Sequence, residues 1–249
     1  MLQAKDGNRR GLVEHRETDR RSVDLSWQRL LKQRTQRAAE VLAGVDGVMG
    51  LILCGSMGRG DPWPLSDIDM ILIYEDGQSE AAAHEVEARR QELSDWWAEE
   101  GYSTGSDVGK LASTRSEVEQ ALSLPPGGAA HVLDNERWFH STEKGYGGRA
   151  VFDPEGVARA LSQWLTEARF ASEVVRRRLE IHQSQAWQRY EEAKAALDEQ
   201  NTLQAAIALR ESLHALTRYL MELWGDETTL GGGSALGSSL PLLREGKQI

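Results

Sequence analysis

The sequence has only one cysteine, Cys54, among its 249 residues. A single thiol excludes a disulfide framework, and its position inside an apolar run is typical of a small buried side chain. Chains with so little cysteine usually fold in a reducing compartment. We therefore predict a cytoplasmic protein.

Long apolar runs are absent as well. Nothing in the sequence approaches the ~18 consecutive apolar residues of a membrane-spanning helix. The N-terminal segment has arginines but lacks the apolar core of a signal peptide. We expect neither a membrane anchor nor export by a visible signal.

Positive charge is scarce relative to negative charge. The chain has 29 Lys and Arg against 39 Asp and Glu, a formal net charge of -10. Domains that bind nucleic-acid backbones are usually basic, so a nucleic-acid partner is not expected. The histidines show no H-x-x-x-H spacing, so we predict no zinc site. Small molecules, nucleotides carried with a metal ion, and cationic ligands fit this composition.

The hydrophobic pattern predicts an α+β domain followed by a helical domain. Its four predicted segments are a mobile arm (1–23), an α+β domain (24–155), a helical domain (156–226) and a flexible glycine-rich tail (227–249). The predicted elements of the second segment are a helix at 24–44, strands at 47–56 and 67–76, a helix at 79–100 capped by Ser79, strands at 106–113 and 131–141 around a helix at 115–122, and a short strand at 149–156.

Helical spacing dominates after residue 157. Apolar residues recur every three or four positions, which predicts one long amphipathic helix or two in succession. A short polar turn, DEQNT, precedes a further helix, so we predict an antiparallel helical hairpin.

The most informative stretch is LILCGSMGRGDPWPLSDIDMILI, residues 51–73. Residues i and i+2 of a strand share a face, so Asp67 and Asp69 point the same way. Two carboxylates on one rigid element suit Mg²⁺, which also takes ligands from substrate phosphates. Gly55 lets the backbone approach a phosphate, Ser56 adds a hydroxyl, and Arg59 is a further candidate phosphate contact.

This stretch resembles the signature of the DNA polymerase β-like nucleotidyltransferase superfamily. The shared features are an apolar strand, Gly55-Ser56, a ten-residue interval, Asp67-Ile68-Asp69 and a second apolar strand. Ser66 and the Met-Gly-Arg-Gly after Ser56 are similar to the small-molecule branch, which includes aminoglycoside and lincosamide nucleotidyltransferases. The resemblance implies that Gly55, Ser56, Arg59 and Ser66 bind the nucleotide.

The resemblance also implies a third carboxylate from a later strand. Asp107, in the next predicted strand, is the preferred metal ligand beside Asp67 and Asp69. Asp134, in the strand predicted after it, competes for that role. If Asp107 is the ligand, Asp134 or Glu136 could be the catalytic base, although an ordinary Asp-Asn turn explains Asp134 equally well.

The implied reaction uses two Mg²⁺ ions and a nucleoside triphosphate, preferably ATP. A nucleotidyl group passes to a hydroxyl of a small molecule, such as an aminoglycoside-like antibiotic, and pyrophosphate leaves. Two alternatives stay open: a protein-adenylylating, antitoxin-type regulator with a HEPN-like helical module, and a silent nucleotide-binding protein. In the former the module is not expected to cleave RNA, because only three residues separate Arg210 from His214. A homodimer is compatible with each reading.

Overall fold

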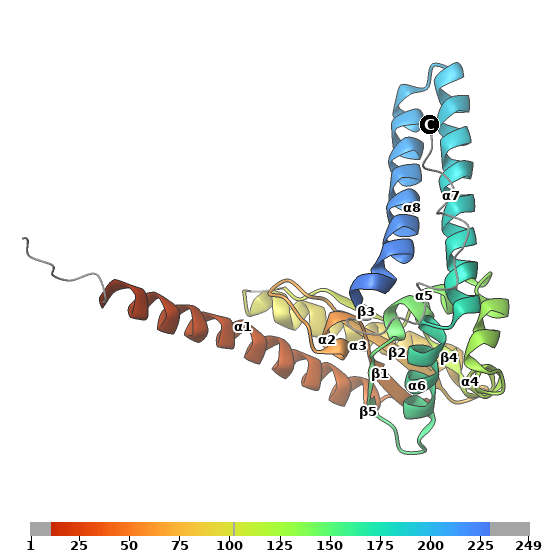
Figure 1. The fold of residues 1–249 in the computed structure, drawn as a ribbon. Helices are drawn as coiled ribbons and strands as arrows, with labels where there is room; N and C mark the ends of the chain where they lie inside the picture. Colours follow the sequence, from red (N-terminus) through yellow and green to blue (C-terminus); the bar gives the residue numbers. More distant parts are fainter. Residues whose placement is uncertain (1–10, 102, 230–249) are drawn as a thin grey trace, which may run out of the picture. The chain divides into compact units, whose positions relative to one another are not determined.

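The computed structural model describes the backbone of residues 11–101 and 103–229, and the side chains of 27–101 and 103–224. The chain forms two compact units, the first ending at Val174 and the second beginning at Val175. A mixed sheet with flanking helices makes up the first unit, and a helical pair follows it (Figure 1). The predicted α+β class is confirmed.

The sheet of the first unit has the strand order β3-β2-β1-β5, and β4 also pairs with β2. β1 runs antiparallel to both β2 and β5, whereas β3 and β4 run parallel to β2. The strands are β1 (Val48–Leu53), β2 (Ile68–Tyr74), β3 (Ser106–Val108), β4 (Ser113–Thr114) and β5 (Arg149–Phe152). The strands predicted at 47–56, 67–76 and 149–156 are confirmed, and the one at 106–113 is two short strands.

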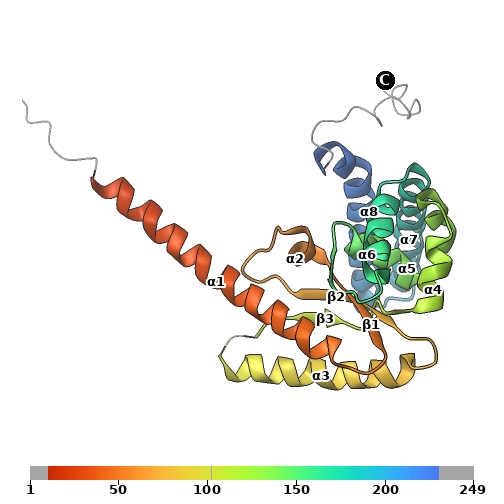
Figure 2. The same cartoon turned by 90° about the horizontal axis from the view of Figure 1, so that it is seen from below.

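Helices cover both faces of this sheet (Figure 2). The helices of the first unit are α1 (Gly11–Ala43), α2 (Gly55–Arg59), α3 (Ser79–Glu99), α4 (Arg115–Leu122), the 3₁₀ helix η1 (Pro126–Val132), α5 (Glu136–Gly145) and α6 (Val157–Arg169). α1 contacts β1 and α3, while α6 contacts β1 and β5, and α5 contacts β2.

Alternation along the strands decides which side chains meet which helices. Leu51 and Leu72 belong to the buried cluster that includes Leu31 of α1 and Trp97 of α3. On the other face, the Ile71 side chain approaches Gly145 of α5. Asp69 shares the parity of Ile71 along β2, so its carboxylate lies at the end of the face that α5 covers.

The helix α1 begins earlier than the sequence pattern indicated. It starts at Gly11 and therefore includes part of the segment predicted as a mobile arm, whose residues 1–10 lie outside the described residues. The predicted cap of α3 was wrong, because Gln78 occupies the N-cap position and Ser79 is the first helical residue.

The strand predicted at 131–141 was wrong. Residues 126–132 form η1, and α5 follows after a turn. The Asn135 side chain accepts a hydrogen bond from the Arg137 backbone N–H at 3.0 Å, which caps α5. Trp138, Phe139 and Thr142 are buried at helical spacing, which explains why this segment is a helix and not a strand.

The helical segment after residue 157 contains two helices before the predicted hairpin turn. α6 ends at Arg169 and α7 (Ser172–Asp198) begins after a short break. α6 packs on the sheet within the first unit, so that unit extends beyond the boundary predicted near 155.

The second unit holds most of α7 and the helix α8 (Thr202–Thr229), joined by a tight turn in which Gln200 has φ of 60°. Three residues of the predicted tail, 227–229, are therefore helical, and the rest of that tail lies outside the described residues. No helix in the described part of the chain is both long enough and apolar enough to cross a membrane.

Candidate active site

The two halves of the sequence motif meet at one edge of the sheet. β1 and β2 are antiparallel, so the end of β1 lies beside the start of β2, with Leu53 opposite Met70. The backbone N–H of Cys54 donates to the carbonyl oxygen of Asp69 at 2.9 Å. The turn that begins at Gly55 is therefore held directly beside the Asp-x-Asp segment.

Gly55 is required by its backbone conformation and by its neighbour. Its φ is 59°, in the left-handed region that favours glycine. A Cβ atom at this position would collide with Oδ2 of Asp69. The absent side chain therefore lets the backbone of α2 lie against the Asp69 carboxylate.

The parallel pairing of β2 with β3 brings the second and third predicted carboxylates together. Asp69 and Asp107 are direct partners in the register, so their side chains project from the same face of the sheet. Asp67 precedes β2 and is exposed, and its carboxylate lies against Gly105, where any Cβ atom would collide with it. The order predicted from the sequence thus places these three residues at one sheet edge.

Sequence reasoning missed a lysine at this edge. Lys144, in the last turn of α5, donates from Nζ to Asp69 Oδ1 at 2.7 Å and to Asp107 Oδ2 at 3.1 Å. The Asp69 side chain is 15% exposed and that of Lys144 is 38% exposed. One ammonium group therefore bridges two carboxylates at a partly buried point.

The charged forms of these groups stabilise one another. Burial alone would raise the pKa of Asp107, but hydrogen bonds from Lys110 and Lys144 outweigh burial and lower it. Burial alone would lower the pKa of Lys144, but its bonds to Asp69 and Asp107 raise it. The Asp107 contribution to stability is present above its unfolded pKa and is lost in acid below it. The Lys144 contribution is present below its unfolded pKa and is lost in strong base.

The predicted serines stabilise the loop between the two halves of the motif. Ser66 is buried, and its Oγ accepts hydrogen bonds from Ser56 Oγ and from the Trp63 backbone N–H, both at 2.9 Å. Arg59 pairs with Asp61 at 3.6 Å, and its guanidinium lies 4.8 Å from the ring centre of Tyr146. Ser66 thus supports the loop, while Ser56 and Arg59 stay partly exposed.

Asp134 and Glu136 do not lie on the strand that the sequence pattern predicted. Asp134 is exposed in the turn between η1 and α5, and Glu136 is the exposed first residue of α5. Lys144 is eight residues beyond Glu136, about 12 Å along the helix axis. His140 lies one turn before Lys144, is partly exposed and approaches Glu143 at 3.4 Å. The base role predicted for Asp134 or Glu136 stays a prediction.

Asp69 and Asp107 are the side chains at this edge that could hold Mg²⁺. Within the described residues, no group of three or more His, Cys, Asp or Glu side chains is gathered closely enough to hold a metal ion. However, Asp69 and Asp107 direct oxygen atoms at one shared cation, the Lys144 ammonium. Mg²⁺ commonly uses one or two carboxylates and completes its shell with water and phosphate oxygens, so this pair fits it.

Residues 12–123 match the family described as "Putative nucleotidyltransferase DUF294". Over this segment, which is less than half of the chain, the sequence is similar to that family. The matched segment includes Gly55, Asp67, Asp69 and Asp107, and it ends before Lys144 and the second unit. Comparisons with curated proteins and with solved structures gave no match.

Lys144 and a metal ion are expected to compete for the same oxygen atoms of Asp69 and Asp107. The change Lys144→Met should tighten Mg²⁺ binding in the absence of nucleotide about tenfold, because it removes a cation that faces both carboxylates. Lys110→Met should have a smaller effect, since Lys110 contacts Asp107 alone and is 79% exposed. Titration calorimetry of both variants and the unmodified chain tests this. Equal affinity in all three would show that the ammonium and the metal do not share a position.

Proposed function

We propose that this protein is an Mg²⁺-dependent nucleotidyltransferase that moves AMP from ATP to a hydroxyl of a small molecule and releases pyrophosphate. The observation that carries the proposal is the in-register pair Asp69 and Asp107, which faces a single cation beside the backbone at Gly55. The family match supports the reaction class. The nucleotide and the acceptor are parts of the proposal.

Each residue at the sheet edge has a defined task in this reaction. Asp69 and Asp107 would hold Mg²⁺, and Asp67, which precedes β2, is the third predicted ligand. When bound, Mg²⁺ supplies charge neutralisation for phosphate oxygens. The Gly55-Ser56 backbone would lie along the phosphates, and Lys144 and Arg59 would add positive charge near them. In this arrangement the acceptor oxygen forms a bond to the α-phosphorus, and the bond from that phosphorus to pyrophosphate breaks.

The acceptor hydroxyl must also lose a proton. Asp134 and Glu136 were the candidates from the sequence, and α5 adds His140, which is one turn from Lys144 instead of two. A neutral imidazole on this side of α5 could take the proton from a hydroxyl placed near the carboxylates. We therefore propose His140 as a further candidate base.

The net charge of -10 favours a cationic acceptor over an anionic polymer. An aminoglycoside-like molecule combines positive charge with several hydroxyl groups. This attraction acts over the whole protein, so cationic compounds with several hydroxyl groups are the first acceptors to test.

Pyrophosphate release with ATP and Mg²⁺ tests the proposal across aminoglycosides, lincosamides and a purified-protein acceptor. Release that depends on one small hydroxyl compound is the expected result. Release with the protein acceptor alone would instead support a protein-adenylylating regulator. Tight Mg²⁺-dependent nucleotide binding without release would support the silent binding protein, and no such binding would overturn the enzyme assignment.

A further inference from the structure

The two helices of the second unit pack through small side chains. The buried small residues recur at intervals of three and four along both helices: Ala193 and Ala196 on α7, and Ala205, Ala208, Ser212 and Ala215 on α8. Ser212 Oγ donates to the Ala186 carbonyl oxygen at 2.8 Å, which fixes the seam between the helices. Small residues let helices approach closely, so this seam uses a narrow strip of each helix.

Large apolar side chains lie one position after this seam on α8. Leu209, Leu213 and Leu216 directly follow Ala208, Ser212 and Ala215, and they are 45%, 54% and 44% exposed. Leu220 continues the same spacing and is partly exposed. The 4-3-4 intervals are those of a coiled-coil seam, in which each residue would face a partner helix.

α7 adds to the same stripe. Trp187 directly follows Ala186, and Leu197 directly follows Ala196, while Tyr190 lies between them at heptad spacing. They are 62%, 61% and 41% exposed, in the order Trp187, Leu197, Tyr190. The helices are antiparallel, so a step of one residue beyond the seam turns both helices toward the same side. These side chains therefore form one face, the apolar face of the hairpin.

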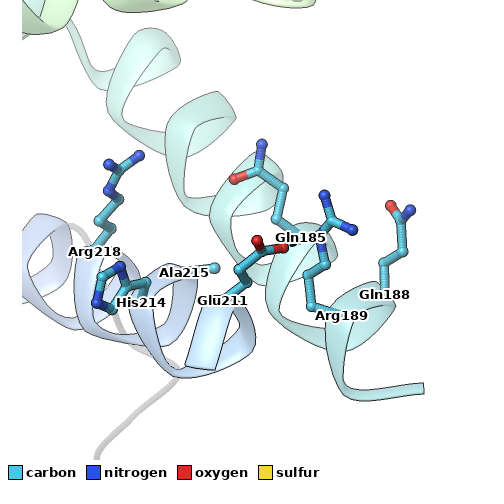
Figure 3. Close-up of a pocket in the computed structure, with 7 residues that line it drawn as sticks. All are labelled: Gln185, Gln188, Arg189, Glu211, His214, Ala215 and Arg218. Carbon is cyan, nitrogen blue, oxygen red and sulfur yellow. Dashed lines mark ion pairs between the residues drawn. The ribbon is translucent and has the colours of Figure 1, made fainter. Parts of the chain in front are cut away.

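The opposite side of the hairpin is polar. Figure 3 shows a groove there, lined by Gln185, Gln188 and Arg189 from α7 and by Glu211, His214 and Arg218 from α8, with a volume of about 350 Å³. Arg189 and Glu211 bridge it with an ion pair of 3.1 Å. The polar groove and the apolar face thus lie on different sides of the hairpin, an arrangement that a solvent-exposed pair would not require.

We propose that the apolar face binds the same face of a second copy of this chain, so that two hairpins form a four-helix bundle. Such bundles need one inward apolar stripe from every helix, and α7 and α8 each present one. A two-fold axis makes the face self-complementary, because each stripe meets a stripe of the same composition. Homodimerisation, which the sequence left open, is thereby assigned to a specific surface.

Size and charge both favour a second copy as the occupant. The seven apolar side chains of the face together expose on the order of 600 Å², near the ~800 Å² that each partner buries in a standard interface. Lys194 lies within the stripe, with its ammonium 5.6 Å from the ring centre of Tyr190, and it forms an ion pair of 2.9 Å with Glu191, which lies near Trp187. Two copies of an acidic chain repel one another, and a face whose lysine and glutamate are paired minimises that repulsion.

Sedimentation and light scattering of the full chain, from about 1 to about 100 μM, test this interface. We expect a dimer whose dissociation constant rises at least about 100-fold in Leu213→Glu/Leu216→Glu, because the interface would then bury carboxylates. Met221→Glu is the matched control. Glu222 is buried and pairs with Arg178 of α7 at 3.2 Å, so it belongs to the seam, and Met221, which precedes it and is 66% exposed, lies on the other side. It should leave the dissociation constant unchanged.

The glutamate variant could fail to fold, and circular dichroism would report that. In that case the double variant Leu213→Gln/Leu216→Gln, which adds no charge, takes its place. A monomeric unmodified chain at the highest concentration would overturn the proposal. Equal weakening by Met221→Glu would also overturn it, because the effect would then not belong to the apolar face. If the unmodified chain is monomeric and the leucine variants lose thermal stability, the chain itself covers the face.

Discussion

Replacing Asp69 with asparagine should lower the rate of pyrophosphate release at least about a thousandfold, which is the largest effect expected at the site. Asp69 is central for three reasons given by its contacts. It is the register partner of Asp107, it accepts the shorter hydrogen bond from Lys144, and it lies against the Gly55 backbone. Asparagine keeps the shape but removes the charge that would bind a cation.

The measurement is single-turnover pyrophosphate release at saturating ATP and Mg²⁺, with the acceptor identified by the panel. Asp95→Asn is a matched control, because Asp95 is an exposed acid on α3 that accepts a hydrogen bond from Gln91. It should retain full activity. A rate for Asp69→Asn within tenfold of the unmodified protein, with the fold intact, would contradict the assignment of this carboxylate.

Gly58→Ala should reduce the free energy of unfolding by about 3 kcal/mol, at the upper end of the cost of overfilling a packed site. A Cβ atom at Gly58 would collide with the carbonyl oxygen of Leu53 and lie 3.2 Å from the Cα of Gly148. Both neighbours are backbone atoms of the sheet region, so no side-chain rotation can relieve the contact. α2 must move, and the Gly55 turn should move with it.

Gly44→Ala provides the same chemical change without the collision. Its Cβ would meet carbonyl oxygens only at 3.5 and 3.7 Å, which are ordinary contacts. Urea denaturation of both variants, followed by circular dichroism, gives the comparison. We expect Gly44→Ala to be within about 0.5 kcal/mol of the unmodified chain. Equal stability of the two variants would show that α2 can shift without cost.

The parts of the site that could be predicted are those whose pattern lies within one short stretch of the sequence. The apolar runs around Gly55-Ser56 and Asp67-Ile68-Asp69 predicted two neighbouring buried strands, which the register of β1 and β2 confirms. The choice of Asp107 came from the family resemblance, which implies a third carboxylate on a later, neighbouring strand, and β3 lies parallel to β2 with Asp107 opposite Asp69. Short-range periodicity was sufficient for these elements.

Lys144 could not be found in this way. The sequence pattern predicts a strand at 131–141, so it offers no helix face from which a lysine could reach the carboxylates. The spacing of Trp138, Phe139 and Thr142 is also that of one buried stripe on a helix, so it could have predicted α5. Even with it, the position of α5 over β2 depends on packing between distant segments, which a single sequence does not specify.

The early start of α1 has a similar explanation. Residues 11–23 are rich in charge and poor in apolar side chains, a composition that predicts an arm without fixed structure. Their backbone is nevertheless helical. Arginine and glutamate are good helix formers, so the helix can extend beyond its apolar stripe.

The strand order has a consequence for how the protein is made. β5 lies beside β1, although about a hundred residues separate them in the chain. Lys144 and β5 are synthesised well after Asp69, so a growing chain carries Asp69 and Asp107 before it carries the lysine that bridges them. A nascent chain stopped before residue 144 would present Asp69 and Asp107 in register without the ammonium that bridges them, and Lys110 would offset the charge of Asp107 alone. The carboxylates should therefore settle into their native geometry late, when α5 closes over β2.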